Sequence, residues 1–161
     1  MGKSRQIQNH LRQCLDTIGE VFEKAEIGMS FASLYNIANK LFAKEKLDNG
    51  GWLSISDPAG INMGHTIPFI DSRGSLKSHD WPEIAGLISQ SRIFVNAVEK
   101  TKIQPSMAFT IEPRLKNIKN DRLPTVFFHT IVQIKKDGQK ELISDFDEIF
   151  KLSGMNYMLS S

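Results

Sequence analysis

Three side chains that commonly bind metal ions stand in three separate strand-like segments of the sequence. His65 follows a glycine in "INMGHTIPFI", Glu112 lies near the end of "MAFTIEP", and His129 lies within "TVFFHTIVQI". Because alternate residues of a strand share a face, each of the three falls among apolar neighbours of its own segment. Taken singly, each is explained as a hydrogen-bonded or solvent-facing side chain. Together they have the composition of a catalytic zinc site with two histidines and one glutamate, and we predict that they form a metal site.

The sequence ahead of these segments predicts two amphipathic helices. From Ile7 to Ala25 apolar residues recur at steps of three and four, which is typical of one face of a helix, and this helix is expected to end near Gly28. Ser30 is a suitable N-cap for a second helix with a similar apolar face, which continues until "DNGG" forces a turn.

The rest of the sequence predicts short strands and further helices. In chain order the predicted elements are a strand in "GWLSIS" (51–56), a "DPAG" turn (57–60), a strand in "INMGHTIPFI" (61–70), a helix beginning near Pro82, a strand in "MAFTIEP" (107–113), a basic loop (114–124), two strands joined by a "KKDG" hairpin turn (135–138), and a short helix around "DFDEIFKLSG" (145–154). We find no internal repeat and no linker, so residues 1–161 are expected to form a single domain.

Cysteine usage and charge exclude several classes of protein. The single cysteine, Cys14, excludes an intramolecular disulfide or a multi-cysteine zinc site, and it fits a reducing compartment, so we expect a cytoplasmic protein. Cys14 lies on the apolar helix face and is expected to be a buried thiol, whereas His10 lies on the polar side and is expected to be exposed. A net charge of +2 gives no indication of nucleic-acid binding, and no apolar run indicates a membrane helix.

Other candidate sites have simpler explanations. "HDWPE" places His79 and Glu83 four residues apart, but it straddles an expected helix start and is interpreted as a capping region. A cationic set is interpreted as a solvated loop rather than an anion site; it consists of Arg114, Lys116, Lys119 and Arg122. The sequence contains no G-x-S-x-G, P-loop, H-E-x-x-H or Rossmann glycine motif.

The segments "MGHTIP", "MAFTIEP" and "VFFHTIVQIKKDG" resemble three successive strands of the pita-bread metallopeptidases, a group that contains methionine aminopeptidase, aminopeptidase P, prolidase and creatinase. The paired helices ahead of them also match that family's order, and the resemblance covers roughly residues 10 to 145. It implies an α+β, incomplete pita-bread fold with two amino-terminal helices, a curved and mainly antiparallel sheet, one further helix and a short carboxy-terminal helix. The chain is thus similar to the carboxy-terminal portion of the family's catalytic domain.

The resemblance also implies a set of metal ligands. His65 matches the family's histidine ligand, Glu112 matches a glutamate ligand, and His129 stands where the family has a bridging glutamate. A second family histidine falls on Ser72, and the family's two aspartate ligands come from strands ahead of the paired helices, where this sequence begins. The implied cofactor is a divalent metal, namely Mn, Zn or Co, and no catalytic residue is assigned.

Two functions are compatible with this pattern. The first is an aminopeptidase- or prolidase-like metallopeptidase domain, truncated or degenerate, with a partial metal site. The alternative is a non-catalytic pita-bread remnant that binds a peptide or a protein partner. In either case we expect a peptide as substrate or ligand, no nucleic-acid or membrane partner, and either self-association or a partner chain that supplies the missing half of the fold.

Overall fold

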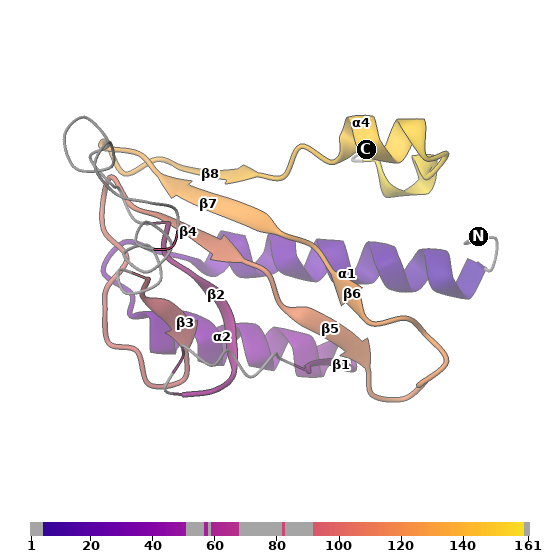
Figure 1. Ribbon diagram of the computed structural model, residues 1–161, viewed down its shortest axis with the longest axis horizontal. Helices are drawn as coiled ribbons and strands as arrows, with labels where there is room; N and C mark the ends of the chain where they lie inside the picture. The colour runs from indigo at the N-terminus through magenta and orange to yellow at the C-terminus, as the bar shows by residue number, and fades with distance from the viewer. Residues whose placement is uncertain (1–4, 51–56, 58, 68–81, 83–91, 160–161) are drawn as a thin grey trace.

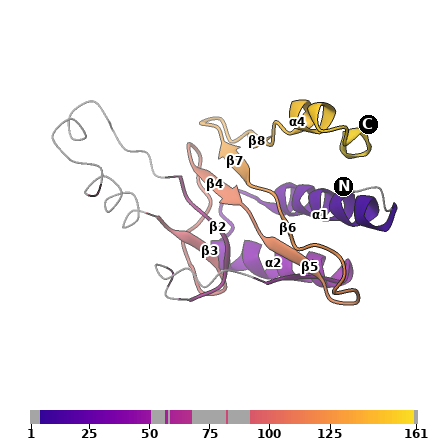
Figure 2. The same ribbon diagram turned by 45° about the vertical axis from the view of Figure 1, so that its right-hand side comes forward.

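The computed structural model describes residues 5–50, 57, 59–67, 82 and 92–159. In this part of the chain, helices α1 (Arg5–Lys24) and α2 (Phe31–Lys44) lie side by side against one face of the strands (Figures 1 and 2). Ser30 caps α2 as predicted, because its hydroxyl oxygen accepts a hydrogen bond from the amide of Ser33 at 3.1 Å. Gly28, with φ 88°, lies in the turn between the two helices.

The strands of the described residues pair in an antiparallel manner throughout. They are β1 (Leu47–Asn49), β2 (Asn62–His65), β3 (Phe94–Asn96), β4 (Ala108–Ile111), β5 (Arg114–Asn117), β6 (Val126–Phe127), β7 (Thr130–Ile134) and β8 (Lys140–Ile143). Their order is β1-β5-β6, β2-β3 and β4-β7-β8. Helix α4 (Asp147–Leu152) and the 3₁₀-helix η2 (Asn156–Met158) follow β8.

Two of these groups are parts of one longer ribbon. The register that pairs Ile111 with Thr130 in β4 and β7 continues without a shift into β5 and β6, where Arg114 pairs with Phe127. Pro113 has no amide hydrogen to donate, which accounts for the break in the ladder between β4 and β5. Glu112 therefore stands opposite His129 at this break.

Strand β2 lies along the other edge of β4. Thr66 forms an antiparallel bridge with Phe109, the Ile67 amide donates to the Ala108 carbonyl at 2.8 Å, and the Glu112 amide donates to the Met63 carbonyl at 2.7 Å. The three segments that carry His65, Glu112 and His129 are thus immediate neighbours.

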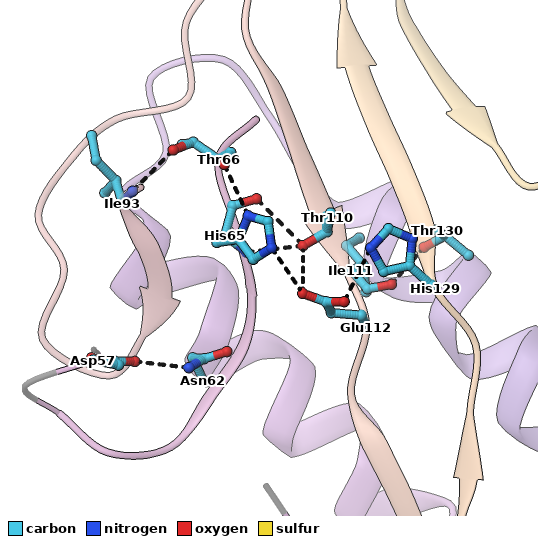
Figure 3. Close-up of polar contacts among 10 residues, drawn as sticks. All are labelled: Asp57, Asn62, His65, Thr66, Ile93, Thr110, Ile111, Glu112, His129 and Thr130. Carbon is cyan, nitrogen blue, oxygen red and sulfur yellow. Dashed lines mark hydrogen bonds and ion pairs between the residues drawn. The ribbon is translucent and has the colours of Figure 1, made fainter. Parts of the chain in front are cut away.

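The core lies between the helices and the sheet. Phe109 on β4 packs its ring against Phe31 of α2 at 5.3 Å between centroids, and both side chains are fully buried. The apolar cluster also includes Cys14 and Ile18 of α1, which agrees with the predicted apolar helix face. On β4, Phe109 and Ile111 belong to this cluster, while Thr110 and the following Glu112 turn toward the candidate site (Figure 3).

Several predictions about local structure are confirmed. The "KKDG" turn joins β7 to β8, with the Lys135 amide donating to the Gln139 carbonyl at 2.7 Å and Gly138 at φ 87°. The short helix around 145–154 is α4. The fold is a mixed α and β architecture, as expected.

Other predictions are wrong. Leu47–Asn49 forms β1 where a turn was expected, and Arg114–Asn117 forms β5 within the predicted basic loop, because the two segments pair with each other. His10 is only 2% exposed, since its ring packs beside Cys14 and its Nε2 lies 2.9 Å from the Pro124 carbonyl. Phe94–Asn96 forms β3, for which no strand was predicted.

Some predictions concern residues outside the described part of the chain. These are the "GWLSIS" strand, nearly all of the helix expected from Pro82, and the residues Ser72, His79 and Glu83. Among the described residues, no helix is both long and apolar enough to cross a membrane.

Candidate metal site

The carboxylate of Glu112 lies between the two imidazoles that the sequence singled out (Figure 3). Its Oε1 lies 3.4 Å from Nε2 of His65, and its Oε2 lies 3.1 Å from Nε2 of His129. The structure therefore brings together all three residues of the predicted metal site. Their role as metal ligands stays a prediction.

Backbone contacts fix the ring of His65. Its Nδ1 lies 2.9 Å from the carbonyl oxygen of Thr66, and because a carbonyl only accepts, this contact places a proton on Nδ1. Thr66 is itself held by Ile93, whose amide donates to the Thr66 hydroxyl and whose carbonyl accepts from the Thr66 amide. This arrangement leaves Nε2 of His65 pointing at Glu112, as in metal sites where the second ring nitrogen is bound by a backbone carbonyl.

Gly64 allows β2 to approach β4 closely. A Cβ at residue 64 would lie 2.1 Å from the carbonyl oxygen of Thr110, a distance that no side chain tolerates. This close approach lets the His65 amide donate to the Thr110 hydroxyl oxygen at 2.9 Å. The glycine that precedes His65 in the sequence thus allows His65 to lie beside Thr110 and Glu112.

Beyond β2, a buried polar cluster supports the strand that carries His65. Asp57 is 4% exposed, and its carboxylate accepts hydrogen bonds from the side-chain amides of Asn62 at 3.0 Å and Asn96 at 2.9 Å. The aspartate of the predicted "DPAG" turn therefore connects the start of β2 to β3 through these two hydrogen bonds. Nothing in the spacing of the sequence indicated the two asparagine partners.

His129 is the most accessible member of the site. Its side chain is 49% exposed, against 18% for His65 and 17% for Glu112. The ring of Phe127 lies 6.5 Å from the His129 ring, and the guanidinium of Arg114 lies 5.1 Å from the Phe127 centroid. Two residues of the predicted cationic loop thus lie in β5. Arg114 lies near the site, and Lys116 forms an ion pair with Asp48 at 3.3 Å.

The chemistry of the donors fits a divalent cation. With a proton on Nδ1 of His65, the Nε2 lone pair of a neutral ring faces an acceptor oxygen of ionised Glu112, and this contact is favourable only when a proton or a metal cation lies between the two atoms. Two ligands of one tetrahedral zinc ion lie roughly 3.4 Å apart. The same separation is found between His65 and Glu112, at 3.4 Å.

The fit is incomplete in one respect. Over the described ranges of the chain, no group of three or more His, Cys, Asp or Glu side chains is arranged to hold a metal ion. His65 and His129 contact different oxygens of Glu112, so their nitrogens face the carboxylate rather than one shared centre. The half-exposed His129 side chain is the one with room to turn toward a common ion.

Thr110 is a site residue that sequence reasoning did not single out. Its hydroxyl lies 3.0 Å from Oε1 of Glu112 and is 2.9 Å from the His65 amide nitrogen that donates to it. Strand alternation in "FTIEP" was a sufficient signal, because it places Thr110 and Glu112 on one face.

Comparisons with known proteins bear on the fold. No protein-family model and no curated protein matches the sequence. Among solved structures, the prolidase from Pyrococcus horikoshii OT3 matches with a TM-score of 0.52 and 18% identity, over 89% of this chain and 32% of the prolidase chain. This chain therefore spans about a third of that prolidase and shares its fold over that region, in agreement with the fold that the sequence resemblance implies.

Proposed function

We propose that this chain contributes part of the metal centre of a prolidase-like metallopeptidase. In this proposal His65, Glu112 and His129 bind one divalent cation, namely Mn, Zn or Co. The observation that carries it is the placement of one carboxylate between two imidazoles, on adjacent segments of a fold shared with a prolidase.

The charges and hydrogen bonds of the site support cation binding. Glu112 is largely buried, and its Oε1 meets both the Thr110 hydroxyl and Nε2 of His65. A carboxylate taken out of water is stabilised by a nearby positive charge, and a metal ion supplies this charge while both imidazoles stay neutral. The contact of Nδ1 of His65 with the Thr66 carbonyl holds the ring ready for coordination through Nε2.

A divalent ion at this position would polarise a peptide carbonyl or activate a water molecule. The described residues beside the three candidate ligands offer no further carboxylate or histidine in contact with them. We therefore assign the additional groups needed for efficient hydrolysis to residues beyond the described part of the chain or to a partner.

The test is a metal titration of the purified, chelator-treated chain at pH 7.5. We expect one Mn²⁺, Zn²⁺ or Co²⁺ ion per chain, with affinity lowered at least tenfold in His65→Ala and Glu112→Ala. Glu141→Gln is a matched control, because Glu141 is an exposed carboxylate on β8 that pairs with Lys135. No binding, or binding that His65→Ala and Glu112→Ala leave unchanged, contradicts the proposal.

Peptide binding with and without metal separates the two candidate functions. Calorimetry with a dipeptide series measures binding to the metal-loaded and the metal-free chain, and the peptidase proposal predicts binding that depends on the metal ion. Peptide binding without metal dependence would favour the non-catalytic alternative over the peptidase proposal.

A further inference from the structure

We propose that Thr110 is the positioning residue for Glu112, and that its hydroxyl sets the orientation of the carboxylate between the two imidazoles. This inference deepens the proposed function and rests on it for the role of the site. It concerns a residue that would not touch the metal ion itself.

The argument begins with the single proton of the Thr110 hydroxyl. The hydroxyl oxygen accepts a hydrogen bond from the His65 amide at 2.9 Å, so its own proton is left to be donated elsewhere. Two acceptors lie in reach, namely Oε1 of Glu112 at 3.0 Å and the carbonyl oxygen of His65 at 3.3 Å. The carboxylate is both nearer and charged, and hydrogen bonds to charged acceptors are the stronger ones, so the proton is donated to Glu112.

Burial makes this arrangement rigid. Thr110 is 1% exposed, so its hydroxyl has no water to bond with, and its position on β4 is set by pairing with Ile131 of β7. The close approach at Gly64 holds the donor amide of His65 against the hydroxyl oxygen. The hydroxyl therefore acts as a fixed link between the backbone of one candidate ligand, His65, and the side chain of another, Glu112 (Figure 3).

The consequence is an assigned role for each carboxylate oxygen. Oε1 is held by the Thr110 hydroxyl on the side of His65, and this leaves Oε2 directed at His129, 3.1 Å away. Without the hydroxyl, rotation of the carboxylate about its last bond loses one of its restraints, and the contacts with the two imidazoles remain. A metal bound by all three residues would then lose the orientation of its only carboxylate ligand.

The experiment compares Thr110→Val, Thr110→Ser and Thr130→Val with the unchanged chain. Valine keeps the shape of threonine without the hydroxyl, whereas serine keeps the hydroxyl. Thr130 is the matched control, because it is also fully buried beside the site but donates to the Ile111 carbonyl at 2.6 Å and not to Glu112. Zinc titration measures affinity, and thermal unfolding confirms that each variant is folded.

We expect Thr110→Val to lower zinc affinity about tenfold to a hundredfold, and Thr110→Ser and Thr130→Val to stay within about threefold of the unchanged chain. Equal losses of zinc affinity in Thr110→Val and Thr130→Val would mean that removing any buried threonine hydroxyl weakens binding through a general effect on the fold. This result would overturn the inference. A loss in Thr110→Ser as large as that in Thr110→Val would also overturn it. If Thr110→Val does not fold, a loss of zinc affinity of more than about threefold in Thr110→Ser still overturns the inference.

A metal-free measurement distinguishes failure of this inference from failure of the proposed function. Long-range ¹H–¹⁵N spectra of the histidine rings in the metal-free chain report their contacts with Glu112. We expect the His65 and His129 ring signals to shift in Thr110→Val but not in Thr110→Ser, even in a chain that binds no zinc. Unchanged ring signals in Thr110→Val would contradict the positioning role.

Discussion

Glu112 stands directly opposite His129 across two antiparallel segments, with Oε2 of the glutamate 3.1 Å from Nε2 of the histidine. This pairing follows from a register that is continuous on both sides of Pro113. The side chain at residue 129 thus determines which charge faces Glu112. With a histidine there, the buried carboxylate of Glu112 does not face a second negative charge.

Replacing His129 by glutamate is expected to destabilise the metal-free chain. Two carboxylates directly opposite each other on paired strands repel, and we expect a loss of about 0.5–1 kcal/mol in the free energy of unfolding. His129→Gln, which is neutral, should cost less. Urea unfolding with and without Mn²⁺ measures both variants, and a metal-induced gain in stability should be larger for His129→Glu. Equal stability of the two variants without metal would show that residue 129 does not face Glu112.

Gly64→Ala is expected to separate β2 from β4. The added Cβ would meet the Thr110 carbonyl oxygen at 2.1 Å, and because the Cβ is fixed by the backbone of residue 64 and the oxygen is itself backbone, neither can yield without moving a strand. We expect a loss of about 3 kcal/mol in the free energy of unfolding, together with loss of metal binding.

Gly19→Ala is the control for this effect. Gly19 lies in the interior of α1, and a Cβ there meets nothing within 4 Å. Alanine favours the helix over glycine, so this variant should gain about 0.5–1 kcal/mol. Denaturant unfolding measures both variants. If Gly64→Ala and Gly19→Ala changed the free energy of unfolding alike, the close approach at Gly64 would not explain the loss in Gly64→Ala.

Lys140→Met is expected to weaken the end of α1. The ammonium group of Lys140 donates to the carbonyl oxygens of Phe22, Glu23 and Ala25 at 3.0, 2.7 and 3.2 Å, at the end of α1, where helix carbonyls run out of amide donors four residues ahead. We expect a loss of about 1–2 kcal/mol in thermal or urea unfolding. Lys135→Met is the comparison, because the exposed Lys135–Glu141 pair should contribute less than about 0.5 kcal/mol.

Cys14 is expected to be unreactive in the folded chain. Burial raises the pKa of its thiol from 9.0 to about 12, so almost no nucleophilic thiolate is present at pH 8.5. Alkylation by iodoacetamide should therefore wait for unfolding, and labelling of the native chain at the rate of a free thiol would contradict the buried placement.

The same shift gives a pH dependence of stability. Above about pH 9 the unfolded chain loses the Cys14 proton while the folded chain keeps it, so the contribution of this thiol to stability is present below pH 9 and falls as the pH rises toward 12. Cys14→Ala should show a shallower loss of stability over this alkaline range. Urea unfolding at pH 8 and pH 10.5 measures the difference.

Local signals in the sequence were enough to predict part of this fold. Ser30 as a cap and the "KKDG" turn depend on residues close to each other in the chain, and both predictions are confirmed. Long-range pairing explains the failures. Arg114–Asn117 presents only Leu115 to the core, so its polar composition indicated a loop until β1 and β6 were known to flank it. His10 is buried by a loop at Pro124, which no pattern within α1 could reveal.

In the candidate site too, local sequence signals identified some residues, and residues that depend on long-range pairing were missed. Strand alternation and the family resemblance selected His65, Glu112 and His129, and the structure brings them together. Alternation places Thr110 on the face of Glu112, but its contact with the His65 amide, like the contact of Asp57 with Asn96, depends on which strands lie beside each other.

The most direct test of the central claim is anomalous diffraction from crystals of the chain grown with Zn²⁺ or Mn²⁺. The proposed site predicts a single strong anomalous peak within about 2.0–2.2 Å of Nε2 of His65 and a carboxylate oxygen of Glu112. No peak at this position, or a peak only at surface residues away from Glu112, would contradict it.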